Sequence, residues 1–133
     1  MINIDELNVY MARLELPYKF EHNSTHKFKE NIIANKPIGN ESFNSDIGSL
    51  IRNEYELSFI SNRKDPRLLF VIACIIDVST GINQQERNDV LHKIGMYDGS
   101  FAKSKKLQFK GYEFRVNYSK SYGLMFQIFL NTK

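Results

Sequence analysis

The stretch LQFKGYEFRVNYSKSYGLMFQIFL, residues 107–130, has the strongest structural signal in the sequence, because apolar and polar side chains alternate along most of it. Such alternation is typical of β-strands that have one buried and one wet face. In the middle segment, one face would hold Tyr112, Phe114, Val116 and Tyr118, and the other Glu113, Arg115, Asn117 and Ser119. The turns Lys110-Gly111 and SKSYG (119–123) separate the segments, so we predict an antiparallel meander.

Upstream of this meander, a helix is predicted over about residues 84–94. Asn83 followed by Glu86 resembles a capping box, and Gly95 is a natural residue just past a helix end. The apolar face of this helix would hold Val90, Leu91 and Ile94.

Two segments before that helix are predicted to be strands. YELSFIS (55–61) alternates, whereas LLFVIACII (68–76) is continuously apolar. A continuous apolar run is typical of a strand covered on both faces, so we expect 68–76 to lie in the centre of the sheet. The sequence NRKDP (62–66) would form the turn between them.

The N-terminal part begins with a predicted amphipathic helix that Asn3 can cap and that Pro17 stops. Its apolar positions follow helical spacing: Ile4, Leu7, Met11 and Leu14. Residues 18–22 alternate like a half-buried strand, and residues 23–46 predict loops with one short helix. A second short helix is predicted over about 45–52.

These elements predict an α+β fold in one domain, residues 1–133, with a mostly antiparallel sheet of about five strands, two to three helices and a C-terminal β-meander. The longest apolar run ends at Asp77 and is too short to cross a membrane. The acidic, polar N-terminus has no secretory signal pattern, so we expect a cytoplasmic protein that does not contact a membrane. Abundant Lys, Asn and Ile residues suggest an AT-rich bacterial genome.

No motif for catalysis, a cofactor or a metal is evident, and we predict none of the three. Cys74 is the only cysteine and is expected to be a small buried hydrophobe. Asp77 would cap a turn, and His92 would lie near a helix C-terminus. A small ribonuclease could still use His22 or His26 together with Lys105 and Arg115, although nothing in their spacing shows that they meet.

The charge is unevenly distributed along the chain, although the net charge is only +3. Residues 99–133 contain seven Lys and Arg residues against one Glu, interleaved with aromatic residues. The loop 97–106 is the expected contact element. Candidate partner-binding residues in the basic part are Phe101, Lys103, Lys105, Lys106 and Tyr122, and those in the acidic part are Glu54 and Glu56.

Our leading functional hypothesis is a binding protein without catalysis, namely a bacterial immunity protein or antitoxin that occludes the active site of a cognate toxin. A basic toxin would favour the acidic residues as the contact surface. The alternative is a small nucleic-acid-binding protein or ribonuclease that uses the basic, aromatic C-terminal sheet. A subunit of a larger assembly is a third possibility.

Overall fold

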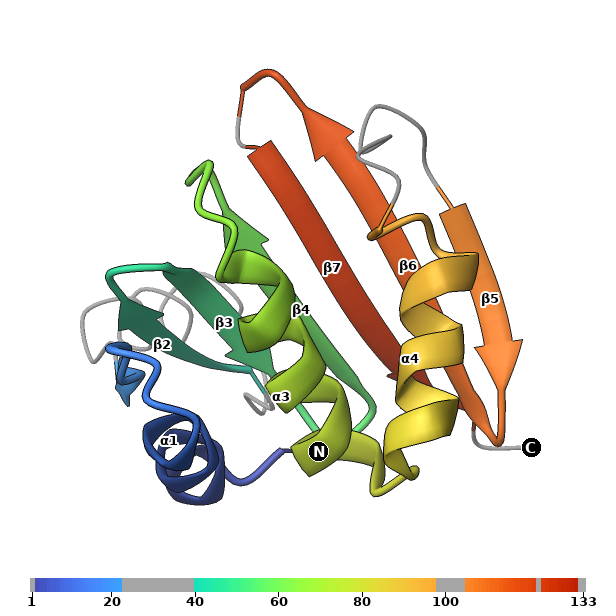
Figure 1. Ribbon diagram of the computed structural model, residues 1–133, viewed down its shortest axis with the longest axis horizontal. Helices are drawn as coiled ribbons and strands as arrows, with labels where there is room; N and C mark the ends of the chain where they lie inside the picture. The colour runs from blue at the N-terminus through green and yellow to red at the C-terminus, as the bar shows by residue number, and fades with distance from the viewer. Residues whose placement is uncertain (1, 23–39, 98–104, 122, 132–133) are drawn as a thin grey trace, which may run out of the picture.

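The computed structural model describes residues 2–22, 40–97, 105–121 and 123–131. In that part of the chain, seven strands form one antiparallel sheet in the order β1-β2-β3-β4-β7-β6-β5, and three helices lie on one face of it (Figure 1). The strands are β1 (Glu21–His22), β2 (Glu41–Ser45), β3 (Gly48–Arg52), β4 (Glu56–Ser61), β5 (Lys105–Phe109), β6 (Tyr112–Ser119) and β7 (Gly123–Leu130). The helices are α1 (Ile4–Arg13), α3 (Leu68–Thr80) and α4 (Gln84–Lys93). The α+β class is confirmed, with more strands than expected.

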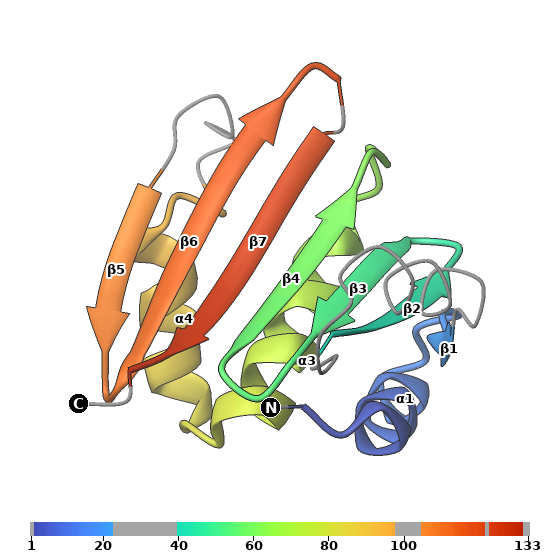
Figure 2. The ribbon, with the colours of Figure 1, turned by 180° about the vertical axis from the view of Figure 1, so that it is seen from behind.

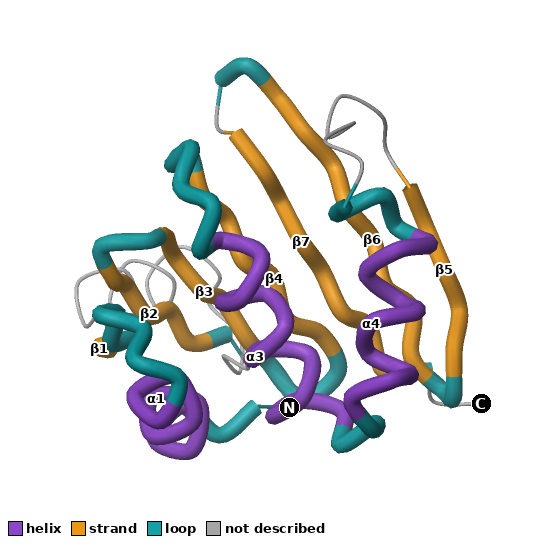
Figure 3. The backbone as a smooth tube through the Cα atoms, in the orientation of Figure 1, coloured by secondary structure: helices purple, strands orange, loops and turns teal. Residues whose placement is uncertain are grey.

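The helices and the sheet form two layers. Seen from behind, the molecule presents the sheet face opposite the helices, which we call the far face (Figure 2). The tube coloured by secondary structure shows α3 and α4 in front of the strands and α1 below β2, next to α3 (Figure 3). The alternation predicted in the meander therefore corresponds to the two sides of the sheet: one set of side chains points toward the helices and the other lies on the far face.

The C-terminal meander is confirmed. β6 pairs with β5 from Lys105–Val116 to Phe109–Tyr112, and with β7 along its whole length. Phe114 and Val116 are buried on the helix side. Lys110 and Gly111 have φ angles of 49° and 84°, as the tight type I′ hairpin turn requires.

The helices α1 and α4 are confirmed together with their caps. The side chain of Asn3 accepts a hydrogen bond from the Glu6 amide at 2.9 Å. At α4, the Asn83 side chain accepts from the Glu86 amide at 2.8 Å, and the Glu86 carboxylate accepts from the Asn83 amide at 3.1 Å. This reciprocal pair is the predicted capping box. Gly95 follows with a φ of +81°.

The segment 68–76 belongs to helix α3, so the prediction of a central strand there is wrong. α3 lies in front of the sheet, between α1 and α4 (Figure 1). Every residue from 71 to 76 is buried, because neighbours surround the helix on nearly all sides. A helix in that position carries apolar residues all round, which gives the same continuous run as a buried strand.

Residues 45–52 form a hairpin turn and β3, so the predicted short helix is also wrong. β2 and β3 pair from Glu41–Arg52 to Ser45–Gly48, and β3 pairs on its other side with β4. Gly48 approaches β4 so closely that a Cβ there would lie 2.4 Å from the Ile60 carbonyl oxygen. Pairing on both sides outweighs the helical spacing of the apolar residues.

The N-terminal strand prediction is only partly right. Of residues 18–22, only Glu21 and His22 pair, with β2. Loops with one short helix were predicted over 23–46. Residues 23–39 of that segment lie outside the described residues, and residues 41–45 form strand β2, so the prediction of a loop there is wrong.

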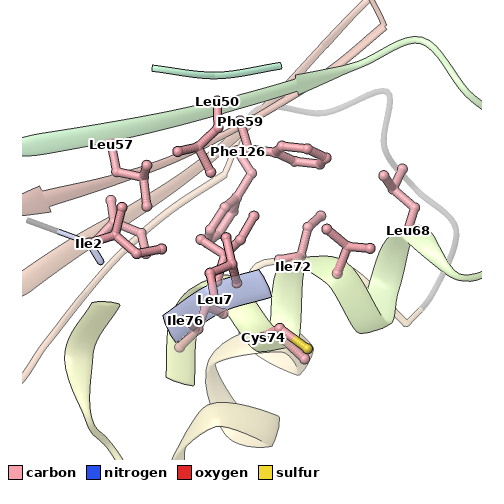
Figure 4. Packing of buried hydrophobic residues seen from close by; sticks show 14 of the residues in the cluster. Ile2, Leu7, Leu50, Leu57, Phe59, Leu68, Ile72, Cys74, Ile76 and Phe126 are labelled. Atoms are coloured by element: carbon pink, nitrogen blue, oxygen red, sulfur yellow. The ribbon is translucent and has the colours of Figure 1, made fainter. Parts of the chain in front are cut away.

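The core lies between the helix layer and the sheet. Leu57, Phe59 and Phe126 of the sheet meet Leu7, Ile72 and Ile76 of the helices, all six without exposed surface (Figure 4). Burial of this apolar surface is the main force that holds the layers together. Among the described residues, no helix is long and apolar enough to cross a membrane.

Candidate binding site

A cleft of about 680 Å³ lies at the end of the sheet where β4 ends and β6 turns back into β7. Figure 1 shows why it forms there: β6 and β7 run past the ends of α3 and α4. Tyr118 and Leu124, which pair across that hairpin, therefore face the helix side without a helix above them. The first turn of α3 also lines the cleft, as do Met96 and Tyr97, which follow α4.

The floor of the cleft is apolar and its rim carries two tyrosines. Leu68, Met96 and Leu124 are buried, whereas Tyr97 and Tyr118 are 45% and 43% exposed. The Tyr97 ring lies against the ring of His92 with 4.2 Å between centroids, so it is held in place by α4. Tyrosine side chains on the rim of an apolar hollow are well suited to binding, because each offers a large rigid surface and a polar tip.

The connection between β4 and α3 gives the rim its charge. Arg63 and Lys64 line the cleft and are exposed. Within the described part of the chain, neither side chain forms an ion pair with a carboxylate.

Among the described residues that line the cleft, the one carboxylate is that of Asp65, and it is already engaged. It accepts hydrogen bonds from the hydroxyl of Tyr18 at 2.8 Å and from Nη2 of Arg67 at 2.9 Å. The Arg67 backbone amide also donates to it, at 2.9 Å. The Arg67 guanidinium beside Asp65 lowers the pKa of that carboxyl well below its usual range. Asp65 thus compensates Arg67, and the rim retains the positive charge of Arg63 and Lys64.

A second, smaller polar hollow lies at the β5–β6 edge of the sheet. It has a volume of about 280 Å³ and is lined by Lys105, Lys106, Arg115 and Asn117. The Arg115 guanidinium lies over the Phe129 ring, 4.5 Å from its centroid, and forms an ion pair with Glu113. Arg115 is therefore partly neutralised and partly covered, which leaves Lys106 as the exposed cation of this hollow.

The predicted partner-binding residues do not form one surface. Lys105 and Lys106 pair with Val116 and Arg115, so they face opposite sides of the sheet. The Lys105 side chain lies on the helix side against Gly95, where an added Cβ would be 2.9 Å from its Nζ. Lys106 lies on the far face. Phe101, Lys103 and Tyr122 lie outside the described residues.

The acidic candidates lie at the start of β4, at the end of the strand that is remote from the cleft. Glu54 is in the turn between β3 and β4, not on an alternating strand, and Glu56 is the first residue of β4. The length of β4, about 17 Å at the usual rise per residue, separates Glu56 from the cleft. Of the basic candidates, Lys106 shares the far face with Glu56 but lies three strands away, in the row of Ser58.

The residues considered for ribonuclease chemistry are also separated. His22 is in β1 and Lys105 in β5, which are the two edges of the seven-stranded sheet. Six inter-strand steps place these edges roughly 29 Å apart. His22 instead lies near Glu41, 3.9 Å between Nε2 and Oε2, and His26 is outside the described residues. The structure does not bring His22 together with Lys105 and Arg115.

Asp77 was expected to cap a turn. Instead, its side chain connects three helices. Its carboxylate accepts a hydrogen bond from the Tyr10 hydroxyl of α1 at 2.6 Å and pairs with Arg87 of α4 at 3.1 Å. Cys74, nearby in α3, is buried as predicted, and burial raises the pKa of its thiol to about 12. The contacts of Asp77 and the burial of Cys74 are those of residues that hold the helices together. No group of three or more His, Cys, Asp or Glu residues that could hold a metal occurs in the described ranges.

Comparison of the chain with protein-family models, with curated proteins and with solved structures finds no match.

The cleft itself was not predicted from the sequence. Its residues come from three segments, 61–69, 96–97 and 118–124, whose proximity depends on the order of the strands. One signal was available: NRKDP (62–66) places two adjacent cations in a connection between predicted elements, where binding residues often lie.

Proposed function

We propose that the chain is a binding protein that acts without catalysis, as a bacterial immunity protein or antitoxin that neutralises a cognate toxin by occluding its active site. The observation that carries this proposal is the cleft between the β4–α3 connection and the β6–β7 hairpin. Its apolar floor, its two half-exposed tyrosines and its cationic rim are the features of a protein-binding surface. Such a protein would act in the cytoplasm, where a single cysteine stays reduced.

The rest of the molecule supports the proposal as a rigid scaffold. Tyr118 and Leu124 belong to paired strands, so these two cleft residues are positioned before any partner arrives. Binding by a preformed surface avoids the entropic cost of ordering it. An inhibitor that works by steric occlusion needs only such a scaffold and one complementary surface.

The test is capture followed by toxicity rescue. Tagged protein is recovered from nuclease-treated lysate of the source organism, and each stoichiometric partner is then expressed alone and together with this chain. We expect one partner to arrest growth alone and the wild-type chain to relieve that arrest. Tyr118→Ser should lower affinity for the partner about 30-fold, as truncation of a central interface tyrosine does.

Tyr55→Ser is the matched control. Tyr55 is 55% exposed but lies in the β3–β4 turn, at the opposite end of β4 from the cleft. It should bind and rescue like the wild type. Loss of rescue by Tyr55→Ser and not by Tyr118→Ser would move the contact surface to the acidic end. A stoichiometric partner that is harmless alone would contradict the immunity function.

A further inference from the structure

We propose that the cleft recognises an extended segment of the partner that combines aliphatic side chains with carboxylates. The proposal rests on the proposed function, because the occupant is taken to be part of a protein partner, and it specifies the chemistry of that occupant.

The floor determines the aliphatic part. Leu68, Met96 and Leu124 close the bottom, and Leu69 and Pro66 line the side beside α3. These side chains offer no charged group, so a buried polar group of the occupant would lose its hydrogen bonds to water without replacement. A leucine-like or isoleucine-like side chain gains by entering, in proportion to the apolar area it covers.

The rim determines the charged part. Arg63 and Lys64 are adjacent in the chain and exposed, and both lie on the β4–α3 connection that borders the cleft. Asp65 cannot serve them, since its two oxygens already accept from Tyr18 and Arg67. A partner segment that places a carboxylate above the apolar floor would supply the missing negative charge. Arginine can bind a carboxylate with two parallel hydrogen bonds, which adds orientation to attraction.

The tyrosines determine how the segment lies. Tyr97 and Tyr118 both line the cleft and come from different elements, one following α4 and the other at the end of β6. Both are half exposed, so a chain lying along the cleft would cover them on both sides. Their hydroxyl groups can donate to backbone carbonyls of such a chain. An extended segment leaves its backbone carbonyls free to accept from these hydroxyls, whereas a helix uses most of its carbonyls internally, so an extended segment suits this rim better.

The test uses the full chain, isotope-labelled for NMR, and two synthetic peptides with blocked ends. One peptide alternates leucine with glutamate, and the other alternates leucine with lysine. We expect the acidic peptide to shift the signals of Leu69, Met96 and Leu124 in a saturable manner, and the basic peptide to bind at least about tenfold more weakly.

Charge reversal of the rim provides the decisive variant. Arg63→Glu/Lys64→Glu should reverse the preference, so that the basic peptide binds more tightly than the acidic one. Lys106→Glu is the matched control, because Lys106 is an exposed cation on the far face, and it should leave both affinities unchanged. Both variants alter exposed side chains, and unchanged spectra outside the mutated loop or strand would verify their folding.

Three results would overturn the inference. They are equal binding of the two peptides, shifts that fall on Arg115 and Asn117 instead of the cleft, and displacement of the acidic peptide by a single-stranded oligonucleotide that shifts the same cleft signals. These outcomes are distinct from failure of the proposed function, which the toxicity rescue reports. Rescue that depends on Tyr118 together with equal peptide binding would retain the proposed function and reject the acidic occupant.

Discussion

Two glycines of the C-terminal meander, Gly111 and Gly123, have nearly the same backbone angle but different surroundings. Their φ values are +84° and +86°, in the region that side chains with a Cβ rarely adopt. A Cβ at Gly111 would meet nothing within 4 Å. A Cβ at Gly123 would lie 2.4 Å from the Ser61 carbonyl oxygen and 2.8 Å from the Asn62 Cα. Gly123 is thus required twice, by its φ angle and by the close approach of β4.

We therefore predict different costs for the same substitution. Gly111→Ala should lower the free energy of unfolding by about 1 kcal/mol, the cost of the left-handed backbone. Gly123→Ala should lower it by about 3 kcal/mol, because the end of β4 must also move. Urea unfolding with an unchanged m-value measures both. Equal losses would mean that the two strands are not in close contact at this point.

At the scale of elements, α3 shows where the sequence misleads. A strand over 68–76 would place Phe70 and Ile72 on the same face, two residues apart. In the helix they point in different directions, and Phe70 is 56% exposed while Ile72 is fully buried. Composition could not decide between them, because Val and Ile favour strands and a surrounded helix has no polar stripe. The flanking Pro66 and Gly81 were the available signals of a helix start and end.

The elements predicted correctly are those with strong local chemistry. α4 has a complete capping box, and β6 alternates over eight residues beside a turn that favours a hairpin. β3 is different: its residues 48–52 form a strand because β2 and β4 pair with it, which no local pattern expresses. Local interactions can be predicted from one sequence, and partners supplied by distant segments cannot.

The contact between α1, α3 and α4 gives a prediction about pH. The hydrogen bond to Asp77, together with burial, raises the pKa of Tyr10 from 10.0 to about 12. The stabilising effect is therefore complete below about pH 10 and is lost as pH rises toward 12, because the unfolded chain releases the Tyr10 proton first. Tyr10→Phe should cost about 1 kcal/mol at neutral pH, and this difference from the wild type should shrink between pH 10 and 12.

Urea unfolding of both proteins across that pH range measures the difference. Other titrating groups are common to the two proteins and cancel in the comparison. Tyr112→Phe is the control, since Tyr112 forms no side-chain hydrogen bond to a carboxylate within the described ranges and its substitution removes no such contact. If the difference in free energy of unfolding between Tyr10→Phe and the wild type stayed constant with pH, the contact with Asp77 would not be the cause of the lost stability.

At the scale of the whole molecule, folding redistributes the charge asymmetry of the sequence. Lys105 and Lys106 are neighbours in the chain but face opposite sides of the sheet. Glu113 lies within the basic segment and pairs with Arg115, which reduces the positive charge of the far face. Arg63 and Lys64 come from outside the basic segment and charge the cleft. The sequence predicted a basic surface in residues 99–133, but the cations of the cleft lie outside that segment, and most of the predicted contact loop 97–106 is outside the described residues.

The aromatic residues follow the same logic. Phe114 and Phe126 face the helices and are fully buried, so neither can stack on a base. Phe129 faces the far side but lies beneath Arg115. The far face of the described part of the C-terminal sheet thus presents cations without an open aromatic platform, which binding of single-stranded nucleic acid requires. The exposed ring of Tyr118 lies on the helix side, in the cleft.

This arrangement predicts how binding depends on salt. Single strands release counterions in proportion to the phosphates contacted, so contacts with Lys106 and Arg115, which share the far face, would give a slope of log affinity against log salt of roughly −1.4. A partner in the cleft meets two exposed cations and an apolar floor, and we expect a slope shallower than about −1. Titration of the captured partner at several salt concentrations measures this. A steep slope would place the function on the far face if Lys106→Glu reduces it and Arg63→Glu/Lys64→Glu leaves it unchanged. The reason is that reversing the charge of Lys106 can remove a phosphate contact only on the far face.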